Sequence, residues 1–292
     1  MKLATVLALL CAPLCIAAPK PVIPEIPEIL KSAKANVSNR ADLGGLTLSL
    51  SSPTPLTDEQ WSAIESLKVR AFIFSGKAGD DPAMSRVVKL DPTALQFFGS
   101  PMTDAGAAHI AEMKSLKTLM MSHADRLTAA AATALANHPS VEVFATDGRF
   151  AAQGMAQIAT AKKLRDVMLQ HTVCSDANIA LLARHPSLEK IRLWPNGNYG
   201  VLTDAALPSL ATLPKLKELT LEFSIFTYAG GLKHLKDIPT LTKLTLGEVA
   251  VSDEDLAQLK ADLPNVTITH TPMKPEYRAK WDQAMATKAK KK

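Results

Sequence analysis

Two histidines and one aspartate are the residues of this sequence that could do acid–base chemistry together. His123, Asp147 and His171 occupy matching positions in three successive segments. If each segment contributes one strand, the histidine backbones lie about 10 Å apart. The pair is then poorly placed to share a small metal ion, because metal–ligand bonds are about 2 Å long. A His–Asp–His polar cluster with hydrolase activity is therefore the least favoured of three functional hypotheses.

Other reactive side chains have structural interpretations. Cys174 directly precedes a predicted helix start, where a small buried residue is expected. His138 and His185 each precede a proline at matching positions, which is typical of helix ends rather than of ligands. The sequence thus predicts no catalytic residue, no metal and no cofactor, and the protein is expected not to be an enzyme.

The elements that must position these residues are repeats. Residues 202–246 contain one pattern twice: a Thr-led helix start, an apolar helix face, a proline, and Leu-x-x-Leu-x-Leu. Taking the first apolar position of each strand as an anchor gives ten anchors separated by 22 to 28 residues. The anchors are Leu43, Val69, Ala94, Leu116, Val141, Leu164, Leu188, Leu216, Leu241 and Val266. A repeat period in the twenties indicates a solenoid, in which each unit buries its apolar face against its neighbours.

Helix starts occur in register between the anchors. A hydroxyl residue followed by an acid can cap the first turn and suit the helix dipole. Such pairs begin at Thr57, Thr103, Ser175, Thr203 and Ser252. Each unit is therefore expected to be a short strand, a loop and a helix of two to three turns.

The repeated unit Thr-Asp-x-x-Leu…Leu-x-x-Leu-Pro-x-Leu-x-x-Leu-x-Leu resembles the leucine-rich repeat, in the helix-bearing form common in exported proteins of some environmental bacteria. The resemblance covers about residues 42–270. It implies an α/β solenoid with a curved parallel sheet on the concave face and helices on the convex face. Two features depart from the family pattern. The Asn that often follows the strand is missing from most units, and one unit has Ala94 and Gly99 where Leu is expected.

The two ends of the chain differ from the repeats. Residues 1–18 are predicted to be a signal peptide, with an uncleaved anchor as the alternative, and residues 19–41 form a Pro-rich lead segment and N-terminal cap. Residues 271–292 are expected to form a helix that caps the last repeat through Tyr277 and Trp281, followed by a basic tail. No later stretch is apolar and long enough to cross a membrane. The protein is thus expected to be exported to the periplasm, the cell surface or the medium.

Charge is concentrated in the tail. The sequence has 33 basic and 28 acidic residues, but residues 273–292 hold seven of the basic and only two of the acidic ones. Without these and Lys2, the body has 25 basic and 26 acidic residues, so a nucleic-acid partner is not expected. The tail suggests a second hypothesis, a structural protein of the cell envelope in weak contact with anionic polymers.

The leading hypothesis places function on the concave face. In Leu-x-x-Leu-x-Leu, the residue between the last two leucines points outward. Along the array this position reads Thr47, Ile73, Phe98, Met120, Ala145, Met168, Arg192, Thr220 and Thr245. Apolar residues from Ile73 to Met168 form a predicted stripe. The later units are polar, with Lys190, Arg192, Trp194, Glu218 and Glu222 as candidate binding residues.

Two questions about this face remain open at the level of sequence. The stripe either binds a protein partner or is covered by Val22, Ile23, Ile26 and Ile29 of the lead segment. An inserted loop with Asn196, Asn198 and Tyr199 is either a binding loop or a tolerated insertion. The favoured prediction is a non-enzymatic repeat protein that recognises a protein, or another macromolecule, on its concave face.

Overall fold

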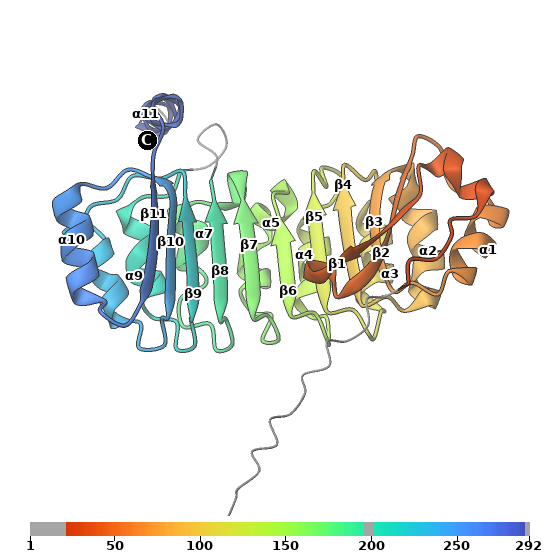
Figure 1. Ribbon diagram of the computed structural model, residues 1–292, viewed down its shortest axis with the longest axis horizontal. Helices are drawn as coiled ribbons and strands as arrows, with labels where there is room; N and C mark the ends of the chain where they lie inside the picture. The colour runs from red at the N-terminus through yellow and green to blue at the C-terminus, as the bar shows by residue number, and fades with distance from the viewer. Residues whose placement is uncertain (1–21, 196–200, 290–292) are drawn as a thin grey trace, which may run out of the picture.

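The computed structural model describes residues 22–195 and 201–289 and consists of one long sheet backed by helices (Figure 1). The expected signal peptide, the loop residues Asn196, Asn198 and Tyr199, and the last three lysines lie outside the described residues. In the described parts of the chain, eleven strands follow one another in the order of the sequence. All neighbours from β2 to β11 are parallel, whereas β1 is antiparallel to β2. The predicted α/β leucine-rich-repeat solenoid is therefore confirmed.

The strands are β1 (Asn36–Arg40), β2 (Gly45–Ser52), β3 (Ala71–Gly76), β4 (Ala94–Phe98), β5 (Thr118–Ser122), β6 (Val143–Thr146), β7 (Asp166–Gln170), β8 (Lys190–Trp194), β9 (Glu218–Glu222), β10 (Lys243–Val249) and β11 (Thr267–Pro272). The α-helices are α1 (Asp58–Ser66), α2 (Asp81–Leu90), α3 (Asp104–Ala111), α4 (Ala129–Ala136), α5 (Arg149–Gln153), α6 (Met155–Ile158), α7 (Asp176–Ala180), α9 (Leu207–Leu210), α10 (Asp253–Asp262) and α11 (Pro275–Ala289). Six 3₁₀ helices complete the described elements: η1 (Glu28–Ala33), η2 (Ala41–Leu43), η3 (Lys77–Gly79), η4 (His171–Val173), η5 (Asp204–Ala206) and η6 (Leu232–Asp237). Among the described residues, no helix has the length and apolar character needed to span a membrane.

The predicted helix starts are formed by side-chain caps. The hydroxyls of Thr57, Thr103, Ser175, Thr203 and Ser252 each accept a hydrogen bond from a backbone N–H of the first helical turn. The acid after the cap also has a role that the sequence did not indicate. In four of the described units, including the one capped by Asp80, this acid accepts hydrogen bonds from the N–H and the hydroxyl of a threonine in the next unit, so it joins consecutive repeats. These pairs are Asp81–Thr103, Asp104–Thr128, Asp176–Thr203 and Asp204–Thr227.

The strand register corrects two of the predicted units. Cα pairing aligns Ser49, Ile73, Gln96 and Met120, so the first anchor lies two residues after Leu43 and the third two residues before Ala94. In this register Leu95 and Phe97 fill the two inward positions and are fully buried, so this unit has large apolar residues where the repeat requires them.

The N-terminal end of the solenoid is closed by the chain itself. Leu30 and Ala33 of η1 and Val37 of β1 are buried in the main core, and β1 extends the sheet as an antiparallel strand. At the other end, β11 keeps exposed or half-exposed side chains along its whole length. The expected C-terminal helix forms as α11, but its Tyr277 packs against Phe223 after β9, and α11 stands above the upper edge of the sheet (Figure 1). Through this contact α11 packs against the loop that follows β9, at the C-terminal ends of the strands, and not against the outer side of β11.

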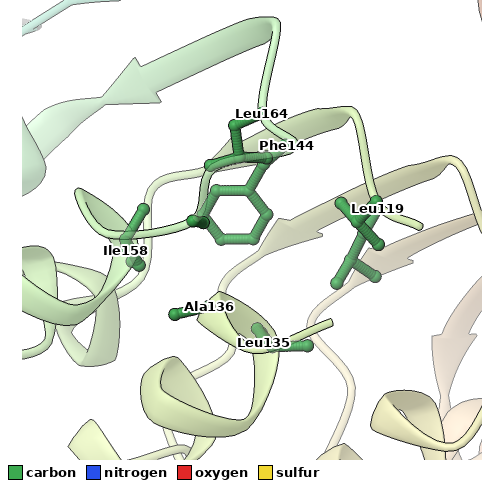
Figure 2. Close-up of a pocket in the computed structure, with 8 residues that line it drawn as sticks. Leu119, Leu135, Ala136, Phe144, Ile158 and Leu164 are labelled. Carbon is green, nitrogen blue, oxygen red and sulfur yellow. The ribbon is translucent and has the colours of Figure 1, made fainter. Parts of the chain in front are cut away.

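A small apolar cavity of about 10 Å³ lies in the core between β5, β6, α4 and α6 (Figure 2). Its lining is Leu119, Leu135, Ala136, Val141, Phe144, Ile158, Ala161 and Leu164. Because these side chains offer no hydrogen-bonding group, we interpret the cavity as imperfect packing and not as a ligand site.

Candidate functional site

The site sought from the sequence lies on the open face, defined here as the face of the sheet opposite the helices and predicted above to be concave. Three columns of outward side chains run across it. From β2 to β11, the middle column reads Ser49, Ile73, Gln96, Met120, Ala145, Met168, Arg192, Thr220, Thr245 and Thr269. Thr47 and Phe98 lie on this face but in the flanking columns, and not in the middle column as predicted.

The open face is covered at its N-terminal end. Leu43, at the tip of the β1–β2 hairpin, is buried in a cluster with Ala71, Ile73 and Ala94. Ile73 is consequently only 8% exposed, so the prediction that it contributes an accessible contact is wrong. In Figure 1 the hairpin runs obliquely in front of this part of the sheet.

The residues that cover this end are not the ones anticipated. Val22, Ile23 and Ile29 are exposed, and Ile26 packs against the main core. The covering side chain is Leu43, which the sequence had suggested as the first strand anchor.

The predicted apolar stripe is interrupted. Gln96 occupies the middle column between Ile73 and Met120, while Phe98 lies beside Ser75 and Ser122 with 44% of its surface exposed. Met120 is half-buried and packs against the cluster beneath Leu43. The stripe is therefore not one continuous apolar surface.

The later half of the open face carries paired charges. The Arg192 guanidinium donates to both oxygens of Glu222, at 2.9 and 3.2 Å. The Lys190 ammonium lies 3.7 Å from the Glu218 carboxylate. These pairs place side chains of opposite charge next to each other on neighbouring strands, with half-buried Met168 beside Arg192 in the middle column.

Asp166 is a member of this surface that the sequence analysis did not select. It stands beside Lys190 and two strands from Glu218 in one column. Burial raises the pKa of Asp166 above its ordinary value, Lys190 opposes the shift, and the Glu218 carboxylate adds to it. Such a desolvated carboxylate suits a cationic group of a ligand. In the sequence, Asp166 could have been found because it occupies the same repeat position as the candidate residues Lys190 and Glu218.

A row of rings borders the charged surface at the C-terminal ends of the strands. The ring centroids are separated by 5.8 Å between His171 and Trp194, by 5.9 Å between Trp194 and Phe223, and by 4.6 Å between Phe223 and Tyr277. The ammonium groups of Lys274 and Lys280 lie 5.7 and 5.6 Å from the Tyr277 centroid. The predicted contact residue Trp194 is thus part of a larger aromatic row that leads onto α11.

The His–Asp–His cluster considered least favourable does assemble. The Asp147 carboxylate accepts the His123 backbone N–H at 2.7 Å, and its Oδ2 lies 3.5 and 3.7 Å from Nδ1 of His123 and His171. Only 4% of the Asp147 side chain is exposed. Among the described residues, no group of three or more His, Cys, Asp or Glu is arranged to hold a metal ion.

The other reactive groups have the structural roles expected from the sequence. Cys174 is fully buried, its Sγ lies 2.8 Å from the Leu169 carbonyl oxygen, and burial raises the pKa of its thiol. A buried thiol of this kind is a poor nucleophile, because the thiolate is the reactive form. His138 and His185 are buried at helix ends, where Nδ1 of each ring accepts a backbone N–H.

The geometry above defines the class of the protein as a leucine-rich-repeat solenoid with one accessible, charged half of the sheet. No family model and no curated protein matches the chain. An internalin, InlF from Listeria monocytogenes, is similar over 82% of this chain and 71% of its own, with 16% identity and a TM-score of 0.48.

Two further solved structures are similar at lower scores. A Bacteroides fragilis protein covers 77% of this chain and 76% of its own, with 14% identity and a TM-score of 0.38. A leucine-rich-repeat protein of Leptospira interrogans covers 76% of this chain and 88% of its own, with 13% identity and a TM-score of 0.23. The class therefore rests on the repeat geometry itself and not on these distant likenesses.

Proposed function

We propose that the chain is an exported, non-enzymatic leucine-rich-repeat protein that binds a protein partner on the part of the open face formed by β7–β10. The observation that carries the proposal is the contrast along this face. Leu43 covers its N-terminal end, whereas the later strands present a charged surface bordered by the aromatic row.

The contacts of this surface support protein recognition. Interfaces commonly combine aromatic and Arg anchors with a polar rim. Trp194 supplies an aromatic group next to the Arg192–Glu222 pair, and Met168 supplies an adaptable apolar contact. Lys190, Glu218 and Asp166 present both signs of charge, so the surface favours a partner segment that itself carries mixed charges.

Binding is tested with the mature protein immobilised and exposed to the extracellular and envelope fractions of its source. Met168→Asp places a carboxylate in the centre of the surface and is expected to abolish capture of the specific partner. Ala130→Asp is the matched control, because exposed Ala130 lies in the first turn of α4 on the helix side, where Asp is well tolerated. Equal capture by both variants contradicts the proposal.

The absence of catalysis is proposed on chemical grounds. In the His–Asp–His cluster, the Asp147 carboxylate accepts the His123 backbone N–H and lies near the ring nitrogens of His123 and His171. The Cys174 thiol is buried, and burial raises its pKa. A broad hydrolase screen is therefore expected to detect no activity. Activity that is present in the native protein and lost in His171→Ala overturns this part of the proposal.

A further inference from the structure

The two edges of the sheet are finished differently. At the first edge, β1 pairs antiparallel with β2 and also has no described strand on its other side, but this edge is backed by the buried side chains of Leu30, Ala33 and Val37. At the last edge, β11 pairs with β10 on one side, and no described strand lies on the other. An unpaired strand edge presents backbone donors and acceptors that another strand can bind.

The backbone geometry identifies which residues face outward at this edge. The Thr267 N–H donates to the Thr242 carbonyl, so the backbone groups of Thr267 point toward β10. Because these directions alternate along a strand, those of Ile268 and His270 point away from the sheet. These two residues can exchange hydrogen bonds with a strand that arrives from outside.

The side chains of β11 are compatible with a second copy of the same strand. Antiparallel pairing centred on Thr269 places Thr269 opposite itself, Thr267 opposite Thr271, and Ile268 opposite His270. The strand carries no Lys, Arg, Asp or Glu, so this register opposes no like formal charges. Thr–Thr pairs across antiparallel strands are favourable, and Pro272, which lacks an N–H, limits the ladder at its end.

The last layer of the core also remains incompletely covered. Val251, Leu256, Val266 and Ile268 pack against the core but are only half-buried, in contrast to Leu30, Ala33 and Val37 at the first edge. A second copy supplies an antiparallel neighbour for β11 and apolar cover for this last layer of the core.

We propose that β11 is a homodimerisation surface, on which two chains pair their β11 strands antiparallel about a two-fold axis. The pairing joins the two sheets into one and places both β7–β10 surfaces near the dimer centre. It does not depend on the proposed partner binding, although two linked surfaces increase avidity for a repetitive partner.

The test is sedimentation velocity of the mature protein over a micromolar concentration series. The native chain is expected to be dimeric, and Thr269→Lys is expected to be monomeric, because two lysines meet at the axis. Thr245→Lys is the matched control: it lies in the same column on β10, one strand from the edge, and should remain dimeric.

Charge complementation makes the test specific for this register. Thr269→Glu should also be monomeric, and mixing it with Thr269→Lys should restore a dimer that contains one of each. Circular dichroism establishes that the variants are folded. A monomeric native chain, equal behaviour of Thr269→Lys and Thr245→Lys, or failure of the folded mixture to associate overturns the proposal.

Discussion

At the scale of single residues, the same backbone corner recurs where the strands end. Gly99, His123, His171 and Phe223 each directly follow an outward-facing strand residue and have φ between 49° and 60°. One of these units uses Gly, for which a positive φ carries no steric penalty. The other three hold bulky side chains there, so Asp147, which accepts the N–H of His123, stabilises a corner that is otherwise unfavourable.

Replacing Gly99 and Gly76 by Ala compares a corner with no steric overlap with a more restricted one. An added Cβ at Gly99 meets no atom within 4 Å, so Gly99→Ala is expected to cost only the left-handed penalty of about 1–2 kcal/mol. At Gly76, φ is 62° and ψ is −145°, a backbone conformation accessible almost only to Gly, and an added Cβ lies 2.6 Å from the Ser52 carbonyl oxygen, so the loss of unfolding free energy should be clearly larger. Urea denaturation measures both; equal losses contradict the assigned contact.

The buried histidines predict a loss of stability in acid. Burial lowers the folded-state pKa of His138 and His185 below the ordinary 6.5, so the unfolded chain binds more protons. Their contribution is complete above pH 6.5 and is lost as the pH falls toward the folded pKa values. The double variant His138→Asn, His185→Asn retains side-chain acceptors and should lose less unfolding free energy than the native chain between pH 7 and 5. An unchanged pH dependence excludes these histidines as its source.

At the scale of elements, the repeats are joined by the acids after the helix caps. Asp81 accepts hydrogen bonds from the Thr103 N–H, the Thr103 hydroxyl and the Gly106 N–H, whereas Asp104 accepts two from Thr128. Asp253 follows its cap in the same way but has no hydrogen bond to a later unit in the described residues. The three acids therefore differ in inter-repeat bonding while sharing a position at a helix start.

Substitution by Ala should rank these acids by their bonds. Asp253→Ala loses only the interaction with the helix dipole, about 0.3–1 kcal/mol. Asp104→Ala also leaves the Thr128 groups unpaired and should cost about 1–2 kcal/mol, with Asp81→Ala costing more because three donors lose their acceptor. Denaturant unfolding of the three variants gives the order. Equal costs would mean that the acids act through the dipole alone.

The small core cavity can be used to test packing between the same elements. Val141→Ile directs one more methylene toward this space and is expected to raise the unfolding free energy by up to about 0.8 kcal/mol. Val167→Ile is the control, because Val167 is fully buried but does not line the cavity, and overpacking should destabilise it by about 1–3 kcal/mol. Thermal unfolding that shows the same sign for both changes contradicts the assigned cavity.

The sequence predicted the repeated elements because their apolar spacing and helix caps are local signals. Its register errors have one cause: a shift of two residues keeps every side chain on the same face, so alternation cannot separate Leu95 from Phe97 or Gln96 from Phe98. The hairpin cover by Leu43 and the contact of Phe223 with Tyr277 depend on how distant segments fold together. The repeat pattern contains no information on such contacts. For this reason the sequence could not predict which part of the open face is covered and which is accessible.

At the scale of the whole molecule, each unit stabilises mainly its neighbours, so the two ends respond independently to change. Among the described residues, the first end is covered by η1 and β1, whereas at the last end β11 keeps exposed or half-exposed side chains along its length. Removal of η1 and β1 should therefore lower the local stability of the nearest strands most, with a smaller effect on each following strand and none on the proposed surfaces at the other end.

Hydrogen exchange on a chain that begins at Ala41 tests this locality. The truncation removes the five residues of β1 that pair with β2, together with the buried Leu30, Ala33 and Val37. Amides of β2 should then exchange with the low opening free energy of a fraying end, β3 should lose part of its protection as Leu43 is released, and β8–β10 should be unchanged. Uniform loss from β2 to β10 would show that the sheet opens as one cooperative unit, whereas unchanged exchange in β2 would show that β1 is not its stabilising cap.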